Sequence, residues 1–370
     1  LIVCNGNAAG QDTMLFAGSN FYGQFGSGMY NYKSSPRVEN VTFKNNCSEN
    51  GGGMYNHISN PILENVKFIN NKASFEGGGM YNLSEAGPVL NNVTFDGNSA
   101  GRNGGGMANL STSNPIMYDV IFKNNTADIR GGAIYNRSHC SPIIKNSVIE
   151  SNNASYYGGG IFNTDKSSPV ITNSVISQNT AYQGGGIYNY FSSSPVINNV
   201  SFNANEYDNS ASAIYNYTSY PEINNSWFLD NEGTDIVNKS SIVLGTHNAS
   251  DDGTASKANV GSGFVNLSGT NLEDLIVDPN DLDGPDDVWL TDDDGFRSVT
   301  CAPIVDAGDK TKVPSGTDGD ILNHDRTVGD NVDIGAYEAS FSNGLSLPTT
   351  AGTYTSDKAI TQGDWTYFVN

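Results

Sequence analysis

The chain repeats one pattern of residues every 25 to 27 positions, and this period constrains its fold more than any other feature. The pattern opens with glycines followed by an apolar residue, an aromatic residue and asparagine, as in GGGMYN at 51–56 and GGAIYN at 131–136. The closing asparagine recurs at Asn31, Asn56, Asn82, Asn109, Asn136, Asn163, Asn189 and Asn216. So constant a period is typical of a solenoid in which each repeat is one structural unit.

Each repeat also contains a second half with its own fixed spacing. Pro88, Asn92, Phe95 and Asn98 show it, and every other repeat has matching residues, with Asp119 replacing one asparagine and isoleucine replacing two phenylalanines. The apolar stretches are short and carry no helical period. Three short strands in 25–27 residues fit one coil of a parallel β-helix, whose coils stack at roughly 4.8 Å. The sequence therefore predicts an all-β, right-handed parallel β-helix of about nine coils within residues 1–240.

The columns of the repeat have predictable roles in such a coil. The Met or Ile two residues before the first asparagine and the Phe or Ile column are expected to stack inside, as Met80 and Phe95. Asparagine tolerates the left-handed backbone of a sharp corner, and stacked amides can bond to one another. The glycines are expected to shape a bend, because no lysine follows them as a phosphate-binding loop would require.

An aromatic column lies between the inward Met or Ile and the asparagine. Its members are Tyr30, Tyr55, Tyr81, Tyr135, Phe162, Tyr188 and Tyr215, with Ala108 interrupting it. The alternation of a strand points these side chains outward. One interpretation is an exposed stripe that stacks on a glycan or a cell-surface protein. The other is that the rings stack on one another and shield the wall.

Acidic residues are concentrated in the last third of the chain. Residues 1–240 carry 12 Lys and Arg against 17 Asp and Glu, whereas residues 241–370 carry 6 against 22, and the net charge is −21. This charge argues against nucleic acid and anionic membranes as partners. No apolar run is long enough for membrane insertion. We interpret residues 241–339 as an acidic region that closes the β-helix, and residues 340–370 as the truncated start of a C-terminal β-domain.

The acidic region contains a candidate calcium site. Asp278, Asp281, Asp283 and Asp287 lie close together in a run that also contains glycine, a composition that can wrap a hard cation. The run lacks the full spacing of an EF-hand loop and its final glutamate. The other interpretation is a solvated acidic loop, and no cofactor is required by any motif.

Many parallel β-helices act on polysaccharides, so a lyase or glycosidase is the alternative to a binding protein. Glycoside hydrolysis needs two carboxylates about 5–10 Å apart on one face. In residues 1–240 the acidic residues are scattered, as Glu64, Glu76, Asp96 and Asp128 illustrate, and no paired-aspartate motif appears. We therefore expect no catalytic residues and favour a non-enzymatic role.

Two motif sets resemble known families. GGAIYN at 131–136 and FKNN, FINN and FDGN at 43–46, 68–71 and 95–98 resemble the repeats of polymorphic outer-membrane proteins and other β-helix adhesins. CAPIVDAGD at 301–309 and DIGAYE at 333–338 resemble the choice-of-anchor type of closing region in exported Bacteroidota proteins, with Ala302 where serine is usual. The resemblance implies an extracellular or cell-surface adhesin or stalk. It also implies export machinery, such as type IX secretion, as a partner.

Overall fold

The computed structural model describes residues 1–4, 14–16, 19–21, 26–207, 213–252, 263–300, 302–329 and 331–339. Residues 1–339 form one compact unit, so the repeats and the acidic region fold together. The C-terminal β-domain predicted for residues 340–370 lies outside the described residues. No helix in the described part of the chain is long and apolar enough to cross a membrane.

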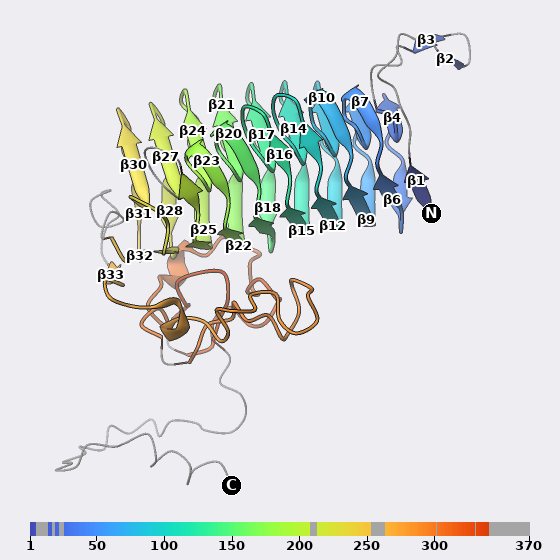
Figure 1. The fold of residues 1–370 in the computed structure, drawn as a ribbon. Coiled ribbons are helices and arrows are strands. Elements are labelled where there is room, and N and C mark those ends of the chain that lie inside the picture. Colours follow the sequence, from blue (N-terminus) through green and yellow to red (C-terminus); the bar gives the residue numbers. More distant parts are fainter. Residues whose placement is uncertain are drawn as a thin grey trace, which may run out of the picture. The chain divides into compact units, whose positions relative to one another are not determined.

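The repeats form a right-handed parallel β-helix whose coils each present three faces (Figure 1). Face C, a nine-stranded sheet, carries the GMYN motif. Its strands are β4 (Met29–Tyr32), β8 (Met54–His57), β11 (Met80–Leu83), β14 (Met107–Leu110), β17 (Ile134–Arg137), β21 (Ile161–Thr164), β24 (Ile187–Tyr190), β27 (Ile214–Tyr217) and β30 (Ile236–Lys239). Identical columns pair in register, for example Met54 with Met80 and Asn56 with Asn82.

Faces A and B complete each coil. Face B has seven strands: β7 (Cys47–Asn50), β10 (Lys72–Glu76), β13 (Ser99–Ala100), β16 (Thr126–Ala127), β20 (Asn153–Tyr157), β23 (Thr180–Gln183) and β26 (Glu206–Tyr207). Face A has fifteen: β1 (Ile2–Cys4), β5 (Arg37–Glu39), β6 (Thr42–Lys44), β9 (Ile62–Ile69), β12 (Val89–Asp96), β15 (Ile116–Lys123), β18 (Ile143–Lys145), β19 (Val148–Glu150), β22 (Val170–Ser177), β25 (Val196–Asn203), β28 (Glu222–Asn224), β29 (Trp227–Leu229), β31 (Leu244–Thr246), β32 (Ala249–Ser250) and β33 (Val265–Asn266). An antiparallel hairpin of β2 (Met14–Phe16) and β3 (Ser19–Phe21) stands apart from the three faces.

The number of coils depends on which face is counted. The nine strands of face C match the predicted nine coils, but only seven coils carry a strand on all three faces in the described residues. The last spacing also shortens, because Asn216 and Asn238 are ladder partners only 22 residues apart. The final coils are therefore incomplete.

The core is built from the two predicted apolar columns. Met80 and Phe95 are fully buried, as are their equivalents in the neighbouring coils. The rings of Phe68, Phe95 and Phe122 lie parallel, with centroids 4.7 and 4.6 Å apart. This distance matches the separation of adjacent strands, so each ring stacks on the one in the next coil.

Three asparagine columns serve different purposes. The amides of the first column, in face C, form a continuous buried ladder, in which Asn82 Nδ2 donates to Asn109 Oδ1 at 2.8 Å. The third column forms a second buried ladder, in which Asn98 Nδ2 donates to Asn125 Oδ1 at 2.9 Å. The second column supplies the left-handed corners, with φ of 51° at Asn92. Amide contacts between coils are therefore present in all three columns, whereas the predicted left-handed corner is formed by the second column.

The glycine triplet is required by close backbone approach as well as by a bend. Gly77 has φ of 68°, which favours glycine. A Cβ at Gly79 would lie 2.7 Å from the Gly106 carbonyl oxygen and 2.7 Å from Cδ1 of Phe95. The first glycine thus allows the turn, and the third admits both the next coil and the stacked phenylalanine.

The acidic region, which includes 3₁₀ helices η1 (Leu272–Asp274) and η2 (Lys310–Lys312), packs on face A of the C-terminal coils. Outward side chains there are apolar, and Trp227 stacks on Phe296 at 5.4 Å. The second asparagine column supplies the polar contacts. Its amide hydrogen bonds to the acidic region are made by Asn146, Asn173, Asn199 and Asn225. In earlier coils the same column bonds to itself, as Asn92 does to Asn65 at 2.8 Å.

Candidate functional site

The predicted tyrosine column forms a second apolar layer on the outer side of face C, separate from the central core. Adjacent rings pack against one another along the coils. Tyr55 and Tyr81 are tilted by 32° with centroids 4.9 Å apart, and Tyr188 and Tyr215 are stacked with centroids 4.8 Å apart. Alternation along each strand therefore places the rings opposite the core, as the sequence predicted. The column runs through Tyr30, Tyr55, Tyr81, Ala108, Tyr135, Phe162, Tyr188 and Tyr215.

Of the two interpretations of this column, the exposed stripe is wrong, and the rings instead shield the wall. From Tyr55 to Tyr215 they retain only 1–7% of their accessible surface, and Tyr30 is half-buried. The rings cover one another, and side chains of the neighbouring columns, such as Tyr157 and Tyr190, pack against them. Most of the column therefore shields the wall of the β-helix.

One part of this layer is open. A pocket of about 300 Å³ lies where face B meets face C and is shaped by side chains from several consecutive coils. It is lined by Arg130, Tyr157, Phe162, Tyr188, Tyr190 and Tyr217. Phe162 and Tyr188 belong to the predicted column, and the other four residues were missed. A sequence signal for two of them exists, because Tyr190 and Tyr217 both stand directly after the asparagine of the motif.

Arg130 is the charged group of this aromatic pocket. Its guanidinium carbon lies 5.4 Å from the ring centroid of Phe162 and 6.0 Å from that of Tyr157, within the range of cation–π contact. Its Nε is buried and has no hydrogen-bond partner in the protein. Burial, and to a smaller degree the neighbouring Tyr215 and Tyr157, raises the pKa of Tyr188, so this phenol remains a neutral donor at physiological pH.

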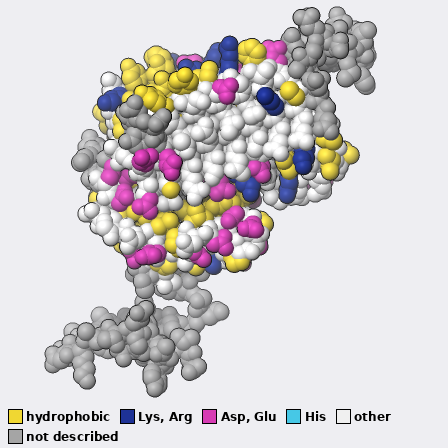
Figure 2. All heavy atoms as spheres, viewed as in Figure 1, with side chains coloured by type: hydrophobic (Ala, Val, Ile, Leu, Met, Phe, Trp, Pro, Cys, Tyr) yellow, Lys and Arg dark blue, Asp and Glu magenta, His cyan; other side chains and the backbone are white. Residues whose placement is uncertain are grey.

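Exposed aromatic residues surround the aromatic pocket. Tyr217 is 40% exposed, Phe191 51% and Tyr156 53%. Figure 2 shows hydrophobic side chains gathered along the upper edge of the coils, over the region of β20 to β27 in Figure 1. Aromatic faces beside a guanidinium can stack on a flat ligand and donate hydrogen bonds to its oxygens.

The aromatic column is broken at Ala108, and the charge of Glu76 acts on the tyrosines on both sides of this break. Glu76 accepts a hydrogen bond from Asn103 Nδ2 at 2.7 Å, and its charge raises the pKa of both Tyr81 and Tyr135 after the larger effect of burial. The Oδ1 atom of Asn103 is buried without a protein partner. This break separates the stack of Tyr30, Tyr55 and Tyr81 from the stack that leads to the aromatic pocket.

The acidic loop brings three of the four predicted calcium ligands together. Carboxylate oxygens of Asp281, Asp283 and Asp287 lie within 4.8 Å of one another. Asp278 is not part of this group, and its Oδ1 instead accepts a hydrogen bond from the backbone of Asn280. The three side chains are partly or fully exposed. Calcium at this loop stays a prediction. Figure 2 shows acidic side chains spread over this part of the surface.

A second carboxylate cluster escaped the sequence analysis. Asp235, Asp251 and Asp252 also place oxygens within 4.8 Å of one another, at the C-terminal end of the coils. The adjacent aspartates at 251 and 252 are the only signal in the sequence, and their partner lies in the previous coil. The cluster could hold a cation, because carboxylate oxygens are the ligands of hard metals.

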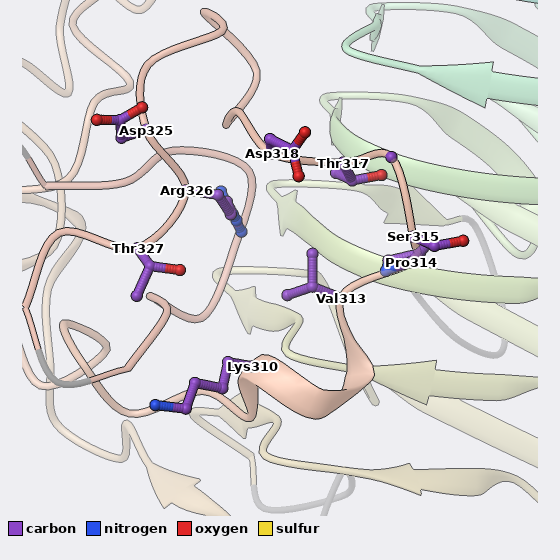
Figure 3. Close-up of a pocket in the computed structure, with 10 residues that line it drawn as sticks. Lys310, Val313, Pro314, Ser315, Thr317, Asp318, Asp325, Arg326 and Thr327 are labelled. Atoms are coloured by element: carbon purple, nitrogen blue, oxygen red, sulfur yellow. The ribbon is translucent and has the colours of Figure 1, made fainter.

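A cavity of about 400 Å³ lies within the acidic region (Figure 3). Arg326 points into it, but its Nη1 donates to the Ala336 carbonyl at 2.8 Å and its Nη2 donates to Gly335. Complete burial lowers the pKa of Arg326, and the charges of Glu338, Asp320 and Asp333 oppose this shift only in part. We interpret Arg326 as a structural residue whose hydrogen bonds connect the loop that carries it to the DIGAYE segment at 333–338.

Among the described residues, face A also carries two adjacent glutamates whose arrangement can be compared with a catalytic carboxylate pair. Glu39 and Glu64 are register partners on β5 and β9. Arg37 forms ion pairs with both, and at 2.7 Å with Glu64. These three side chains are substantially exposed, so the arrangement is that of a surface ion-pair network.

Comparison with known proteins supports the fold. Residues 2–173 match the model of a protein family described as a right handed beta helix region. No curated protein and no solved structure matches the chain significantly. The protein is thus a β-helix repeat protein, and its fold is compatible with both surface proteins and polysaccharide-active enzymes.

Proposed function

We propose that this chain is a non-enzymatic glycan-binding protein of the bacterial cell surface, an adhesin or surface stalk, with the aromatic pocket as its binding site. The observation that supports this most is the combination of Tyr157, Tyr190 and Tyr217 with Arg130 around a pocket of about 300 Å³. Sugar rings stack on tyrosine faces, and a guanidinium can bind hydroxyl or carboxylate oxygens. Export, by a route such as type IX secretion, and surface location rest on the resemblance of the repeats and of the closing region.

The pocket fits one or two sugar rings of a longer chain. Side chains that line it come from consecutive coils, so a linear polymer bound at the pocket could continue along the coils on either side. The negative overall charge disfavours a strongly anionic polymer. Arg130 would then select a single acidic or hydroxyl-rich residue at the pocket. A protein ligand with a protruding aromatic or acidic side chain is the other partner class.

The proposal is tested by glycan-array screening followed by calorimetric titration with a hit. Tyr217→Ala should weaken binding about two- to tenfold, because a stacked ring contributes about 0.5–1.5 kcal/mol. Tyr32→Ala is the matched control, because Tyr32 occupies the same column on β4 and is also exposed. It should leave affinity unchanged.

The same experiment separates the alternatives. Loss of binding in both variants, or in neither, would contradict the assignment of the pocket. An array without any hit would favour a purely mechanical spacer. Product analysis by mass spectrometry after prolonged incubation tests the alternative of a polysaccharide lyase or glycosidase, which would release shorter oligosaccharides.

A further inference from the structure

Arg130 carries a positive charge that no carboxylate of the described chain neutralises. Among the residues that the structure describes, its side chain forms no ion pair and donates no hydrogen bond, and its Nε is buried without an acceptor. Other arginines of the coils are paired, because Arg37 contacts Glu64 at 2.7 Å and Nε of Arg137 lies 3.9 Å from Asp165. A guanidinium carries five N–H donors in a planar fork. The donors of Arg130 are therefore available to a ligand.

The surrounding coils hold this guanidinium in place at the aromatic pocket. The backbone of Arg130 forms parallel bridges with Asn103 on one side and Tyr157 on the other. The guanidinium carbon lies 5.4 Å from the ring centroid of Phe162 and 6.0 Å from that of Tyr157. These rings position the charge without accepting its hydrogen bonds. A group that is already ordered loses less conformational freedom when a ligand binds.

The lining of the aromatic pocket is compatible with an anion. Within the part of the chain that the structure describes, none of the residues that line it is acidic. Burial raises the pKa of Tyr188, so this phenol stays neutral at physiological pH and does not repel an anion. Of the 39 acidic residues of the chain, most follow residue 240, whereas the described lining lies between Arg130 and Tyr217. The charge of the described lining is therefore positive.

The length of the pocket exceeds that of one sugar ring. Arg130 opposes Tyr157 in the next coil, and Tyr190 and Tyr217 belong to the two coils that follow. Three strand separations place Arg130 and Tyr217 roughly 14 Å apart along the coils. The rings of Tyr190 and Tyr217 are tilted, with centroids 5.4 Å apart. One residue of a glycan can thus lie beside the guanidinium while the next stacks on these two rings.

We propose that the aromatic pocket selects a sugar residue that carries a carboxylate, which Arg130 binds. This inference rests on the glycan-binding function proposed above and names the class of sugar. A carboxylate can accept two parallel N–H bonds from a guanidinium, and such charge-assisted bonds are stronger than bonds between neutral groups. A neutral sugar would leave the charge of Arg130 unpaired. Because the net charge of −21 disfavours a polyanion, the ligand is a glycan in which acidic residues are isolated among neutral ones.

The test uses the chain of residues 1–370 on a glycan array that carries matched pairs. Each pair consists of a glucose, galactose or mannose oligosaccharide and the same oligosaccharide with one uronic acid residue, so only a carboxylate replaces a hydroxymethyl group. The pair that binds best is then titrated by calorimetry. Wild type should bind the acidic member about tenfold more tightly or better than the neutral one. This preference should decrease at high salt.

Arg130→Gln removes the charge but keeps a polar side chain at the pocket. It should weaken binding of the acidic member about tenfold or more, and the affinity for the neutral member should stay within about twofold of wild type. Unchanged binding of the neutral member also shows that the pocket is folded. Arg130→Lys keeps the charge without the planar fork, and it should retain only part of the preference.

Arg102→Gln is the matched control. Arg102 lies one coil earlier, is exposed, and stacks on Phe75 with its guanidinium carbon 4.7 Å from the ring centroid, but it does not line the pocket. Its loss removes the same charge and should leave the preference for the acidic member unchanged.

The outcomes separate this inference from the proposed function. Equal binding of acidic and neutral members by wild type would overturn the selection of a carboxylate and leave glycan binding standing. The same conclusion follows if Arg130→Gln keeps the preference, or if Arg102→Gln loses it to the same extent. A sulfated oligosaccharide that binds more tightly than the uronic acid would overturn the assignment to a carboxylate. An array on which no member of any pair binds would contradict the proposed function as well.

Discussion

The buried asparagine ladder of face C makes a quantitative prediction for Asn109→Ala. Asn109 is fully buried, accepts from Asn82 Nδ2 at 2.8 Å and donates to Asn136 Oδ1 at 2.8 Å. Removing its amide leaves one donor and one acceptor unsatisfied in neighbouring coils. At about 1–3 kcal/mol for each of these two groups, the free energy of unfolding should fall by about 2–6 kcal/mol.

The control is Asn92→Gly in the exposed second column. Asn92 Nδ2 donates to Asn65 Oδ1 at 2.8 Å, a bond of the same length, but both residues face solvent. Glycine also keeps the left-handed backbone of this corner, where φ is 51°. Water replaces the lost partner, so the variant should lose less than about 1 kcal/mol.

Both variants are measured by urea unfolding, monitored by circular dichroism at equilibrium. The comparison depends on the midpoint and the slope together, because a partial loss of coils would lower the slope. If Asn109→Ala lowers the free energy of unfolding by less than about 1 kcal/mol, or by no more than Asn92→Gly does, then burial of the ladder does not determine how much its hydrogen bonds stabilise the protein. The reasoning given for the asparagine columns would then be refuted.

Three further outcomes are expected. Gly79→Ala should destabilise the protein by about 2 kcal/mol or more in the same urea assay, because its Cβ would lie 2.7 Å from Cδ1 of Phe95, and unchanged stability would contradict this. Trp227→Ala should cost about 3 kcal/mol and expose the acidic region to limited proteolysis, whereas wild-type protection would show that the acidic region is held by other contacts. Burial raises the pKa of Asp294 to about 6 despite the hydrogen bond from Tyr337. The folded wild type therefore loses a proton-linked stabilisation as pH rises from 4 to 6, and its stability should fall by at most about 2 kcal/mol relative to Asp294→Asn. Parallel pH profiles of the two proteins would refute this.

The repeat made the fold predictable in considerable detail. Met80 and Phe95 could be assigned to the core because a stacked column presents the same side chain to the same environment in every coil. The exposure of the tyrosine column could not be assigned in this way. Alternation fixes the side of the sheet on which Tyr188 lies, but its burial depends on Tyr157 from the adjacent face. That contact depends on the angle between faces B and C, and the length of the repeat does not specify this angle.

The sites outside the regular coils were harder to predict for a different reason. Asp235 meets Asp251 across a coil whose spacing departs from the period, so no column of the repeat aligns them. The sequence indicates only indirectly that the acidic region packs against face A. Outward positions of face A become apolar in the later coils, at Val148, Val175 and Trp227, which indicates that something covers them.

The second asparagine column bonds within itself in the N-terminal coils and gains hydrogen bonds to the acidic region in the C-terminal coils. This difference divides the coils into two groups, and the number of coils is constrained differently in each. Asn65 and Asn92 bond within their own column, and a coil added or removed there would simply lengthen or shorten the series. Asn173 and Asn225 are matched to fixed points of the acidic region, at the carbonyls of Gly319 and Asp309. A coil inserted between them would move one anchor out of reach. Length variation among relatives of this chain should therefore be confined to the N-terminal coils.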